Sequence, residues 1–294
     1  MNLHPSFISH MEARFSEFFQ APLTLTGAAP VYGGDINQCY RLETSSGPYF
    51  MKVNASLFGL DFFEKEARGL ILLANTGAIK VPRPLFDGKF HQQVYLVMEA
   101  LEKGRPKPDF WEEFGTAIAQ LHRNTHTHYG LDYPNYIGRL HQVNTPDTSW
   151  PLFYEKNRIM PLVYKAKERL LLDLPDVEQA ESLCAQFPNL LPHEAPSLLH
   201  GDLWSGNYMV SQTGQPAVFD PAAYYGHREL DLAMARLFGG FDTRFFQAYQ
   251  SAWPLQPGWE ERQSLYQLYP LLVHLLLFGG KYRGQVTEIL KKFS

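Results

Sequence analysis

Hydrophobic residues recur at two different spacings along this chain, and the change between them divides it into two parts. Residues 7–19 place apolar side chains three and four positions apart, which is typical of an amphipathic helix. Short β-branched runs separated by glycine and proline follow, and these predict strands. We expect strands at 23–31, 36–43, 49–53, 83–86 and 94–98 and a helix at 62–73. The first hundred residues therefore predict a five-stranded sheet covered by a helix.

The pattern becomes mostly helical after residue 100. The run Lys103-Gly104-Arg105-Pro106-Lys107-Pro108 interrupts both spacings, which places a lobe boundary just before it. We expect an N-terminal lobe over residues 1–100 and a C-terminal lobe over residues 101–294. Helices are predicted at 110–121, 230–237, 244–251, 263–278 and 285–292, and strands only at 197–199, 208–210 and 217–219. The fold class is α+β, with a small β-rich lobe and a larger, mainly helical one.

Two runs with candidate chemistry lie beside the late strands. The first is His200-Gly201-Asp202-Leu203-Trp204-Ser205-Gly206-Asn207, and the second is Phe219-Asp220-Pro221-Ala222. Kinase phosphoryl-transfer sites place a base aspartate five residues before a metal-binding asparagine, and a metal-binding aspartate follows on the next strand. We therefore predict Asp202 as the general base and Asn207 and Asp220 as Mg²⁺ ligands. The alternative is that these side chains only cap turns.

These runs also carry a family resemblance. Glycine at the second position of His200-Gly201-Asp202 points away from protein kinases. With this glycine, the run resembles that of small-molecule kinases such as aminoglycoside and choline kinases. Trp204-Ser205-Gly206-Asn207 followed by Phe219-Asp220-Pro221-Ala222 resembles the fructosamine kinase (ketosamine 3-kinase) family, from about Pro30 to Phe278. The resemblance implies a two-lobed protein kinase-like fold and an enzyme that uses ATP and Mg²⁺.

The same resemblance implies the acceptor. It would be a ketosamine, either a fructosamine or a ribulosamine, free or attached to protein lysines. The family's 3-phosphate product decomposes and releases the amine, so the implied role is deglycation repair. Two rivals remain: another small-molecule kinase acting on an aminoglycoside, choline or a homoserine-like acceptor, and an inactive kinase-like binding protein.

Candidate phosphate-binding residues lie in the small lobe. Gly33, Gly34 and Asn37 belong to a loop between two strands, where a glycine backbone can approach phosphate oxygens, although Gly-Gly is also an ordinary hairpin turn. Lys52 shares a strand face with apolar residues and needs a charged partner. Glu66 is the predicted partner because it lies on the apolar face of its helix, whereas Glu64 lies on the opposite side.

Nucleotide and acceptor contacts are expected at five further positions. Met98, Glu99 and Leu101 lie at the predicted hinge, whose backbone would bond adenine, although an ordinary strand end fits equally. Trp204 is a candidate to stack on the acceptor, with core packing as the alternative, and Tyr224 could border the acceptor site.

Four histidines and an aspartate are expected to have supporting or surface roles. His200 and Asp231 are expected to brace the catalytic residues. His122, like His126 and His128, is expected at the surface.

Composition narrows the partners. The 26 basic and 30 acidic residues leave a net charge of −4, which argues against nucleic acid. The longest apolar run, 268–278, is too short to span a membrane, and the N-terminus lacks a secretory pattern, so a cytoplasmic enzyme is expected. Cys39 and Cys184 are too isolated for a disulfide framework or a metal site, and Cys39 is either a buried strand residue or redox-sensitive. Sugar preference and oligomeric state stay open.

Overall fold

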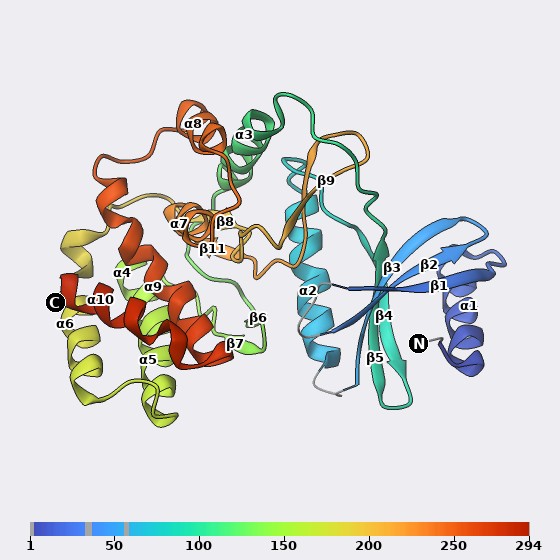
Figure 1. Ribbon diagram of the computed structural model, residues 1–294, viewed down its shortest axis with the longest axis horizontal. Coiled ribbons are helices and arrows are strands. Elements are labelled where there is room, and N and C mark those ends of the chain that lie inside the picture. The colour runs from blue at the N-terminus through green and yellow to red at the C-terminus, as the bar shows by residue number, and fades with distance from the viewer. Residues whose placement is uncertain (1–2, 33–36, 56–58, 294) are drawn as a thin grey trace.

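The protein has two lobes joined by an extended segment (Figure 1). This computed structural model describes residues 3–32, 37–55 and 59–293. The small lobe holds a five-stranded antiparallel sheet in the order β1-β2-β3-β5-β4. Its strands are β1 (Leu25–Val31), β2 (Gln38–Thr44), β3 (Gly47–Asn54), β4 (Pro84–Phe90) and β5 (Gln93–Glu99).

One helix covers each face of this sheet (Figure 1). Helix α1 (Pro5–Phe19) buries Phe7, Met11 and Phe15 against the outer face. Helix α2 (Gly59–Ala74) packs Phe63, Leu70 and Leu73 against the face that looks toward the large lobe. Because successive side chains of a strand point to opposite faces, each strand can supply both packing surfaces.

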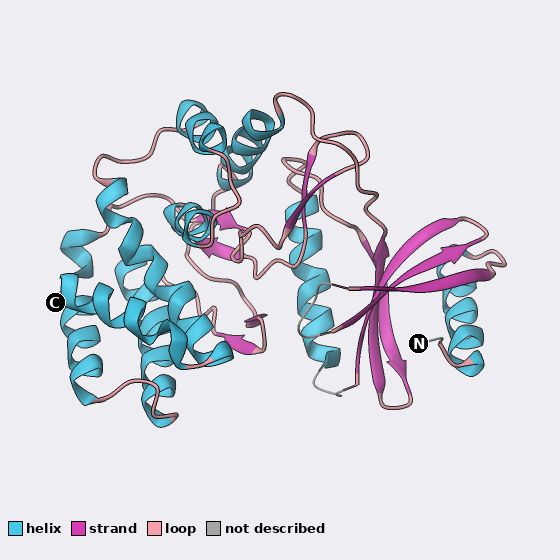
Figure 2. Ribbon diagram, viewed as in Figure 1, coloured by secondary structure: helices cyan, strands magenta, loops and turns pink. Residues whose placement is uncertain are grey.

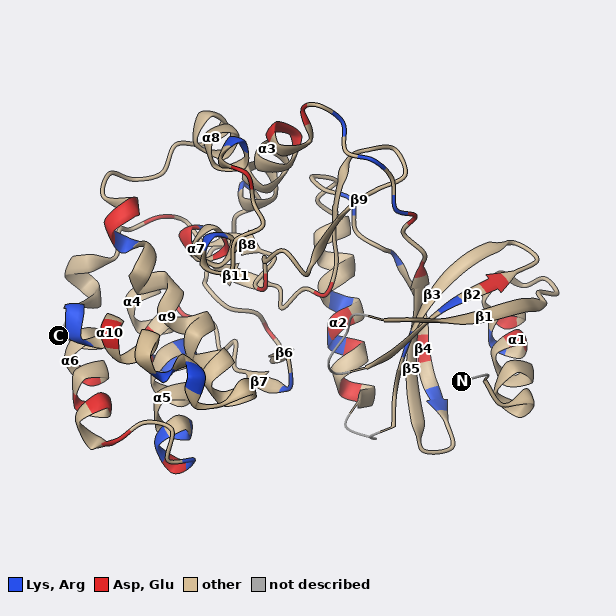
Figure 3. Cartoon of the chain, viewed as in Figure 1, with Lys and Arg blue, Asp and Glu red and all other residues tan. Residues whose placement is uncertain are grey.

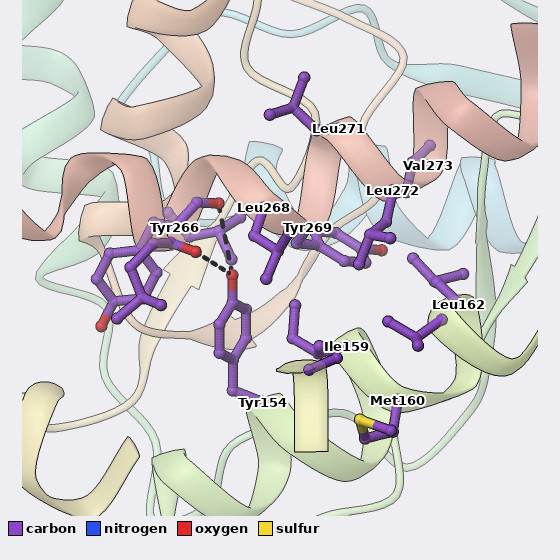
Figure 4. Close-up of a cluster of buried hydrophobic side chains, with 14 of the residues drawn as sticks. Tyr154, Ile159, Met160, Leu162, Tyr266, Leu268, Tyr269, Leu271, Leu272 and Val273 are labelled. Carbon is purple, nitrogen blue, oxygen red and sulfur yellow. Dashed lines mark hydrogen bonds between the residues drawn. The ribbon is translucent and has the colours of Figure 1, made fainter. Parts of the chain in front are cut away.

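The large lobe is mainly helical, and Figure 2 shows its few short strands near the middle of the molecule. Its longest helix, α9, packs against α5, α7 and α10 around the buried cluster drawn in Figure 4. Its helices are α3 (Phe110–His122), α4 (Trp150–Tyr154), α5 (Met160–Glu168), α6 (Leu174–Leu190), α7 (Glu229–Leu237), α8 (Thr243–Ala252), α9 (Trp259–Phe278) and α10 (Arg283–Phe293). A π-helical turn, Glu155–Ile159, joins α4 to α5, and a 3₁₀ turn, Gly280–Tyr282, precedes α10.

The short strands of the large lobe form three antiparallel pairs. Strand β8 (Ser197–Leu199) pairs with β11 (Tyr224–Gly226), and β9 (Tyr208–Val210) pairs with β10 (Pro216–Val218). The third pair, β6 (Asn135–Ile137) and β7 (Leu140–Gln142), is remote in sequence from the others. The prediction of only three strands in this half was wrong: β6, β7 and β11 are too short to show a periodicity, whereas the three predicted strands flank the candidate catalytic runs.

The predicted elements otherwise match closely, including the last strand of the sheet, which runs from Pro84 to Phe90 rather than 83–86. Strand β5 ends at Glu99, and the next helix begins at Phe110. The lobe boundary that we propose, at residues 100/101, falls within this linker. Within residues 3–32, 37–55 and 59–293, no helix has the length and apolar character needed to cross a bilayer.

Candidate active site

The catalytic loop, residues 200–207, follows β8, and hydrogen bonds from its backbone to Asp231 hold it in place. The Asp231 carboxylate accepts the backbone N–H of His200 at 2.7 Å and that of Gly201 at 2.9 Å. Gly201 has φ +81°, and a β-carbon there would lie 2.2 Å from the carbonyl oxygen of Ala222, so only glycine fits. The predicted bracing role of Asp231 is therefore present in the structure.

Two buried histidines belong to the same support. His200 accepts the Asp202 N–H at Nδ1 and donates from Nε2 to the Phe219 carbonyl at 3.1 Å. Burial lowers the pKa of His200, so the neutral ring can make both bonds. His122 is also buried, with its Nε2 3.2 Å from Asp231 Oδ2 and its Nδ1 2.8 Å from the Tyr249 hydroxyl. The prediction of a surface position for His122 was wrong, because its polar partners come from distant α7 and α8.

The candidate base Asp202 is oriented by Asn207. The Asn207 side-chain amide donates to the Asp202 backbone carbonyl and to its Oδ2, both at 2.9 Å. Burial raises the pKa of Asp202 to about 7, the Asn207 amide opposes this shift, and the nearby Asp220 carboxylate adds to it. A carboxyl with such a pKa is suited to accept a proton near neutral pH.

Asp220 follows β10 in an unusual backbone conformation. Its φ is +57°, in the left-handed region that aspartate tolerates better than most residues. The side chain is about half exposed and lines the cleft between the lobes. Directly before it, the Phe219 N–H donates to the Asn207 carbonyl at 3.0 Å. The catalytic loop and the Asp220 loop, residues 219–223, are thus bonded side by side.

Lys52 of β3 joins the small lobe to this assembly. Its ammonium lies 2.6 Å from Glu66 Oε1 and also contacts Asp220 Oδ1. Lys52 is 5% exposed and Glu66 is 7% exposed. Burial alone would lower the pKa of Lys52, but the carboxylates of Asp220 and Glu66 outweigh it and raise the pKa. The predicted pairing with Glu66 is confirmed, whereas Glu64 contacts Lys65 and Arg68 on the outer side of α2.

These groups surround one cleft of about 590 Å³ between the lobes. The small lobe contributes Asn37, Cys39 and Lys52, and the hinge contributes Glu99, Ala100 and Leu101. The catalytic side contributes Asp202, Trp204, Asn207 and Asp220. Beyond them the far end of the cleft is lined by Tyr136, Ile137, Gly138, Val273, His274, Leu277 and Phe278. The arrangement places a lysine, a base and two candidate metal ligands around one cavity.

Comparisons with known proteins assign this assembly to a family. The model of the fructosamine kinase family matches residues 7–294. This chain belongs to the fructosamine kinase family. A protein from Lactiplantibacillus plantarum named a probable ketoamine kinase is 41% identical over 278 residues, covering 93% of this chain and 97% of that protein. The ketosamine-3-kinase of Mus musculus is 35% identical over 291 residues, covering 89% and 93%.

Solved structures agree with this fructosamine kinase assignment. A protein from Haemophilus somnus 129PT with a provisional fructosamine-3-kinase name superposes with a TM-score of 0.88 at 30% identity, covering 96% of each chain. An aminoglycoside phosphotransferase superposes with a TM-score of 0.66 at 17% identity, covering 97% of this chain and 99% of that one. The second likeness shows the fold alone. The predicted family and the two-lobed protein kinase-like fold are both confirmed.

Most predicted site residues of this fructosamine kinase family member that the structure describes meet at the cleft, but two of them do not line it. Tyr224 is fully buried, its ring packs on Phe153 with centroids 5.9 Å apart, and the Arg158 guanidinium lies 3.9 Å from its centroid. The prediction that Tyr224 borders the acceptor is therefore wrong, because β11 turns it into the core. The Met98 side chain is also buried in the core, and Met98 is paired with Phe50 of β3 and Pro84 of β4.

Other predicted residues remain candidates. Gly33 and Gly34 lie outside the described residues. Asn37 lines the cleft, and its Oδ1 accepts the Asn54 side-chain amide at 2.8 Å. Glu99 binds the backbone N–H of Arg83 through its carboxylate at 3.2 Å, at the hinge where an adenine contact was expected. Their roles toward a nucleotide stay predictions.

The structure also adds cleft residues that sequence reasoning missed. His274 and Phe278 sit one turn apart on α9 within an apolar run that resembled plain core. The one available signal in the sequence was a histidine, His274, inside the apolar run 268–278.

Proposed function

We propose that the protein transfers the γ-phosphate of ATP to a sugar hydroxyl of a ketosamine. The acceptor is a fructosamine or a ribulosamine, free or attached to a protein lysine. The 3-hydroxyl is the proposed position, after the name of the Mus musculus relative. The observation that carries the proposal is the joint arrangement of Lys52, Asp202, Asn207 and Asp220 in a fructosamine kinase family member. A binding protein without activity would not need this complete set.

The residues divide the reaction between them. Asp202 accepts the proton of the attacking hydroxyl, whose oxygen forms a bond to the γ-phosphorus while the bond to the ADP oxygen breaks. Lys52, held by Glu66, neutralises phosphate charge. His200 and Asp231 keep the loop that bears Asp202 in place. Positioning and electrostatics do most of the work in this type of reaction.

Asn207 and Asp220 suit a magnesium ion. Because the Asn207 side-chain nitrogen is bonded to Asp202, the amide oxygen remains for a metal, and Asp220 supplies a carboxylate oxygen. Mg²⁺ prefers such oxygen ligands and is usually held by one or two protein groups together with phosphates and water. Within the described part of the chain, no group of three or more His, Cys, Asp or Glu side chains could hold a metal by itself. Bound Mg²⁺ would neutralise charge developing on the transferred phosphate.

The far end of the cleft suits a sugar. Trp204 is 36% exposed and its ring covers Gly206, where a β-carbon would lie 2.3 Å from the indole. His274 Nδ1 bonds the Pro270 carbonyl at 2.7 Å, and burial lowers the pKa of the ring, which leaves Nε2 as a neutral acceptor. An aromatic face and a hydrogen-bond acceptor that line the same cleft can bind a sugar ring and its hydroxyls.

Charge argues against a polycationic antibiotic as the acceptor. Among the described residues that line the cleft, the acidic side chains are Glu66, Glu99, Asp202 and Asp220. Each has another partner or the catalytic role, which leaves none for several ammonium groups. Figure 3 shows acidic and basic residues interspersed over both lobes.

A substrate panel tests the proposal. Magnesium-dependent consumption of ATP would be measured with a fructosamine, a ribulosamine, an aminoglycoside and choline, and phosphorus NMR would locate the product phosphate. Turnover with a ketosamine alone is expected. Turnover with only an aminoglycoside or choline, or with none of the four, would overturn it. We also propose a cytoplasmic location, in keeping with two cysteines that are both free.

A further inference from the structure

A hairpin of the large lobe reaches across to the small lobe. Strands β6 and β7 extend from the helical lobe, and β6 lies against α2, the helix that carries Glu66 (Figure 1). The hairpin is separate in the sequence from β3, α2 and the catalytic loop, which carry the candidate phosphate-binding and catalytic residues. It therefore provides a second link between the lobes, apart from the chain connection at the hinge.

The hairpin is fixed to the Asp220 loop by buried polar groups. The Asn135 side-chain amide donates to the Ala223 carbonyl at 2.8 Å, and that of Gln142 donates to the Ala222 carbonyl at 3.2 Å. Both side chains are buried, and Asn144 joins them by donating to Asn135 Oδ1 at 2.8 Å. Because unpaired buried amides are costly, these bonds hold the hairpin at a defined position relative to Asp220.

Behind the hairpin, the π-helical turn presents Arg158 to the same network. This side chain is fully buried and donates to Asn144 Oδ1 at 2.7 Å. Single π-helical turns inside longer helices often occur near functional sites. The large lobe thus supports the hairpin from its core.

On its other side the hairpin segment contacts α2 at two places. The Tyr136 hydroxyl donates to Asp61 Oδ2 at 2.6 Å, and its ring centroid is 5.5 Å from that of Phe62. Two turns along α2, the Arg68 guanidinium lies 3.5 Å from the centroid of the Tyr133 ring. Glu66 lies between these two contacts in the sequence of α2, on the inward face.

Helix α2 also lies directly on the Asp220 loop. A β-carbon added at Gly69 would come within 3.4 Å of Pro221 Cγ and 3.8 Å of Ala223 Cβ. The helix, the loop and the hairpin therefore form one packed unit, which the contacts of Lys52, Tyr136 and Tyr133 connect.

We propose that Tyr136 and Tyr133 are positioning residues that hold α2 in register with the Asp220 loop, so that Glu66 keeps Lys52 at the nucleotide phosphates. They act through α2 and not by touching the nucleotide. The proposal rests on the proposed function for its kinetic consequences, but its structural core concerns nucleotide binding alone. Asp61 is absent from the residues that line the cleft, whereas Tyr136 lines it, so the effect of the two residues on nucleotide binding has to be measured without acceptor.

The test is a double-mutant cycle of Tyr136→Phe and Asp61→Ala. Binding of a non-hydrolysable ATP analogue with Mg²⁺ would be measured by calorimetry without acceptor, together with kcat and KM for ATP on a ketosamine. Each single change should weaken analogue binding about fivefold, as loss of one hydrogen bond to a charged group allows. The double variant should be no weaker than the weaker single variant, and melting temperatures should stay close to that of the wild type.

Tyr164→Phe is the matched control, because the Tyr164 hydroxyl makes the same kind of bond to Glu181 Oε1, at 2.9 Å, on an exposed surface away from the cleft. Analogue binding by Tyr164→Phe should equal that of the wild type. Equal affinities for Tyr136→Phe and Tyr164→Phe, or losses that multiply in the double variant, would overturn the proposal. If the wild type failed to phosphorylate any ketosamine, the proposed function would fail while the analogue affinities would still decide the role of Tyr136.

Discussion

The Asn207 side-chain amide donates to Asp202 Oδ2 at 2.9 Å, so the proposed metal ligand orients the proposed base. The same amide also bonds the Asp202 backbone carbonyl, which closes the five-residue turn between them. The spacing of these two residues is therefore a geometric requirement, because one side chain must reach both oxygens. This relationship explains why a short local motif carries so much information.

Replacing Asp202 by asparagine tests the base. Asp202→Asn keeps the shape of the side chain and removes the proton acceptor, so kcat should fall at least about a hundredfold, equivalent to about 3 kcal/mol at the barrier. Affinity for ATP and the melting temperature should change little. Asp109→Asn, at an exposed position outside the cleft, is the control and should retain full activity. Near-normal turnover by Asp202→Asn would assign the base to another group.

The catalytic core could be predicted because its information is local or periodic. Asp202, Asn207 and Asp220 follow from fixed spacings, and Glu66 follows from its place on the apolar face of a helix. His122 could not be placed, since its partner Asp231 lies 109 residues away in the sequence. Burial of a polar side chain depends on such distant partners.

The acceptor side was harder to predict for a related reason. The β6–β7 hairpin has strands of three residues, which are too short for any alternation to appear. Tyr224 stood next to the Asp220 loop in sequence, but pairing of β11 with β8 turns its ring toward Phe153. Proximity in sequence to a catalytic residue did not predict the side to which a side chain points.

A second cycle tests the buried ion pair of Lys52 and Glu66. Lys52→Met and Glu66→Ala should each lower kcat/KM for ATP, and the double variant should lose less than the product of the two losses. Lys52→Met should be the more harmful single change, because Lys52 also contacts Asp220. Steady-state kinetics with varied ATP provides the measurement.

Glu64→Ala is the control for this cycle. The Glu64 side chain is exposed and pairs only with Lys65 and Arg68 in the described structure, so kcat/KM for ATP should be unchanged. Losses that multiply fully in the Lys52→Met/Glu66→Ala variant would contradict a functional pair.

His227 should make the fold sensitive to acid. Its ring is buried, stacked on Tyr266 with centroids 5.2 Å apart, and burial lowers its pKa to about 3 against the opposing effect of Glu194. Below pH 6.5 His227 binds a proton in the unfolded chain but not in the folded protein. The free energy of unfolding therefore falls as the pH falls from 6.5 toward 3. At pH 5 this costs about 2 kcal/mol relative to pH 7.

Urea unfolding of the wild type and of His227→Phe at pH 7 and pH 5 measures this contribution. His227→Phe keeps an aromatic ring in place and removes the titrating group, so its loss of stability between the two pH values should be about 2 kcal/mol smaller than that of the wild type. His193→Phe, at an exposed position, should lose as much stability as the wild type. An equal loss in His227→Phe would show that other groups cause the acid sensitivity.

Trp204 provides the sharpest test of the acceptor site. Its ring lines the cleft two residues after Asp202 and meets Phe238 edge-on at 6.4 Å, outside the buried clusters of either lobe. If it stacks on the sugar, Trp204→Leu should raise KM for a ketosamine by a factor that corresponds to about 1–3 kcal/mol of lost binding. KM for ATP and the melting temperature should barely change, because the ring contributes little to the core.

Trp111→Leu supplies the contrast for Trp204→Leu. Trp111 packs on Phe114 and Tyr208 away from the cleft, so its loss should lower the melting temperature and leave KM for the ketosamine unchanged. The two variants together separate an aromatic ring that binds the acceptor from one that packs the fold. A Trp204→Leu protein that melts early with an unaltered ketosamine KM would behave like Trp111→Leu, and the acceptor would then have to be held by His274 and the other α9 side chains at the far end of the cleft.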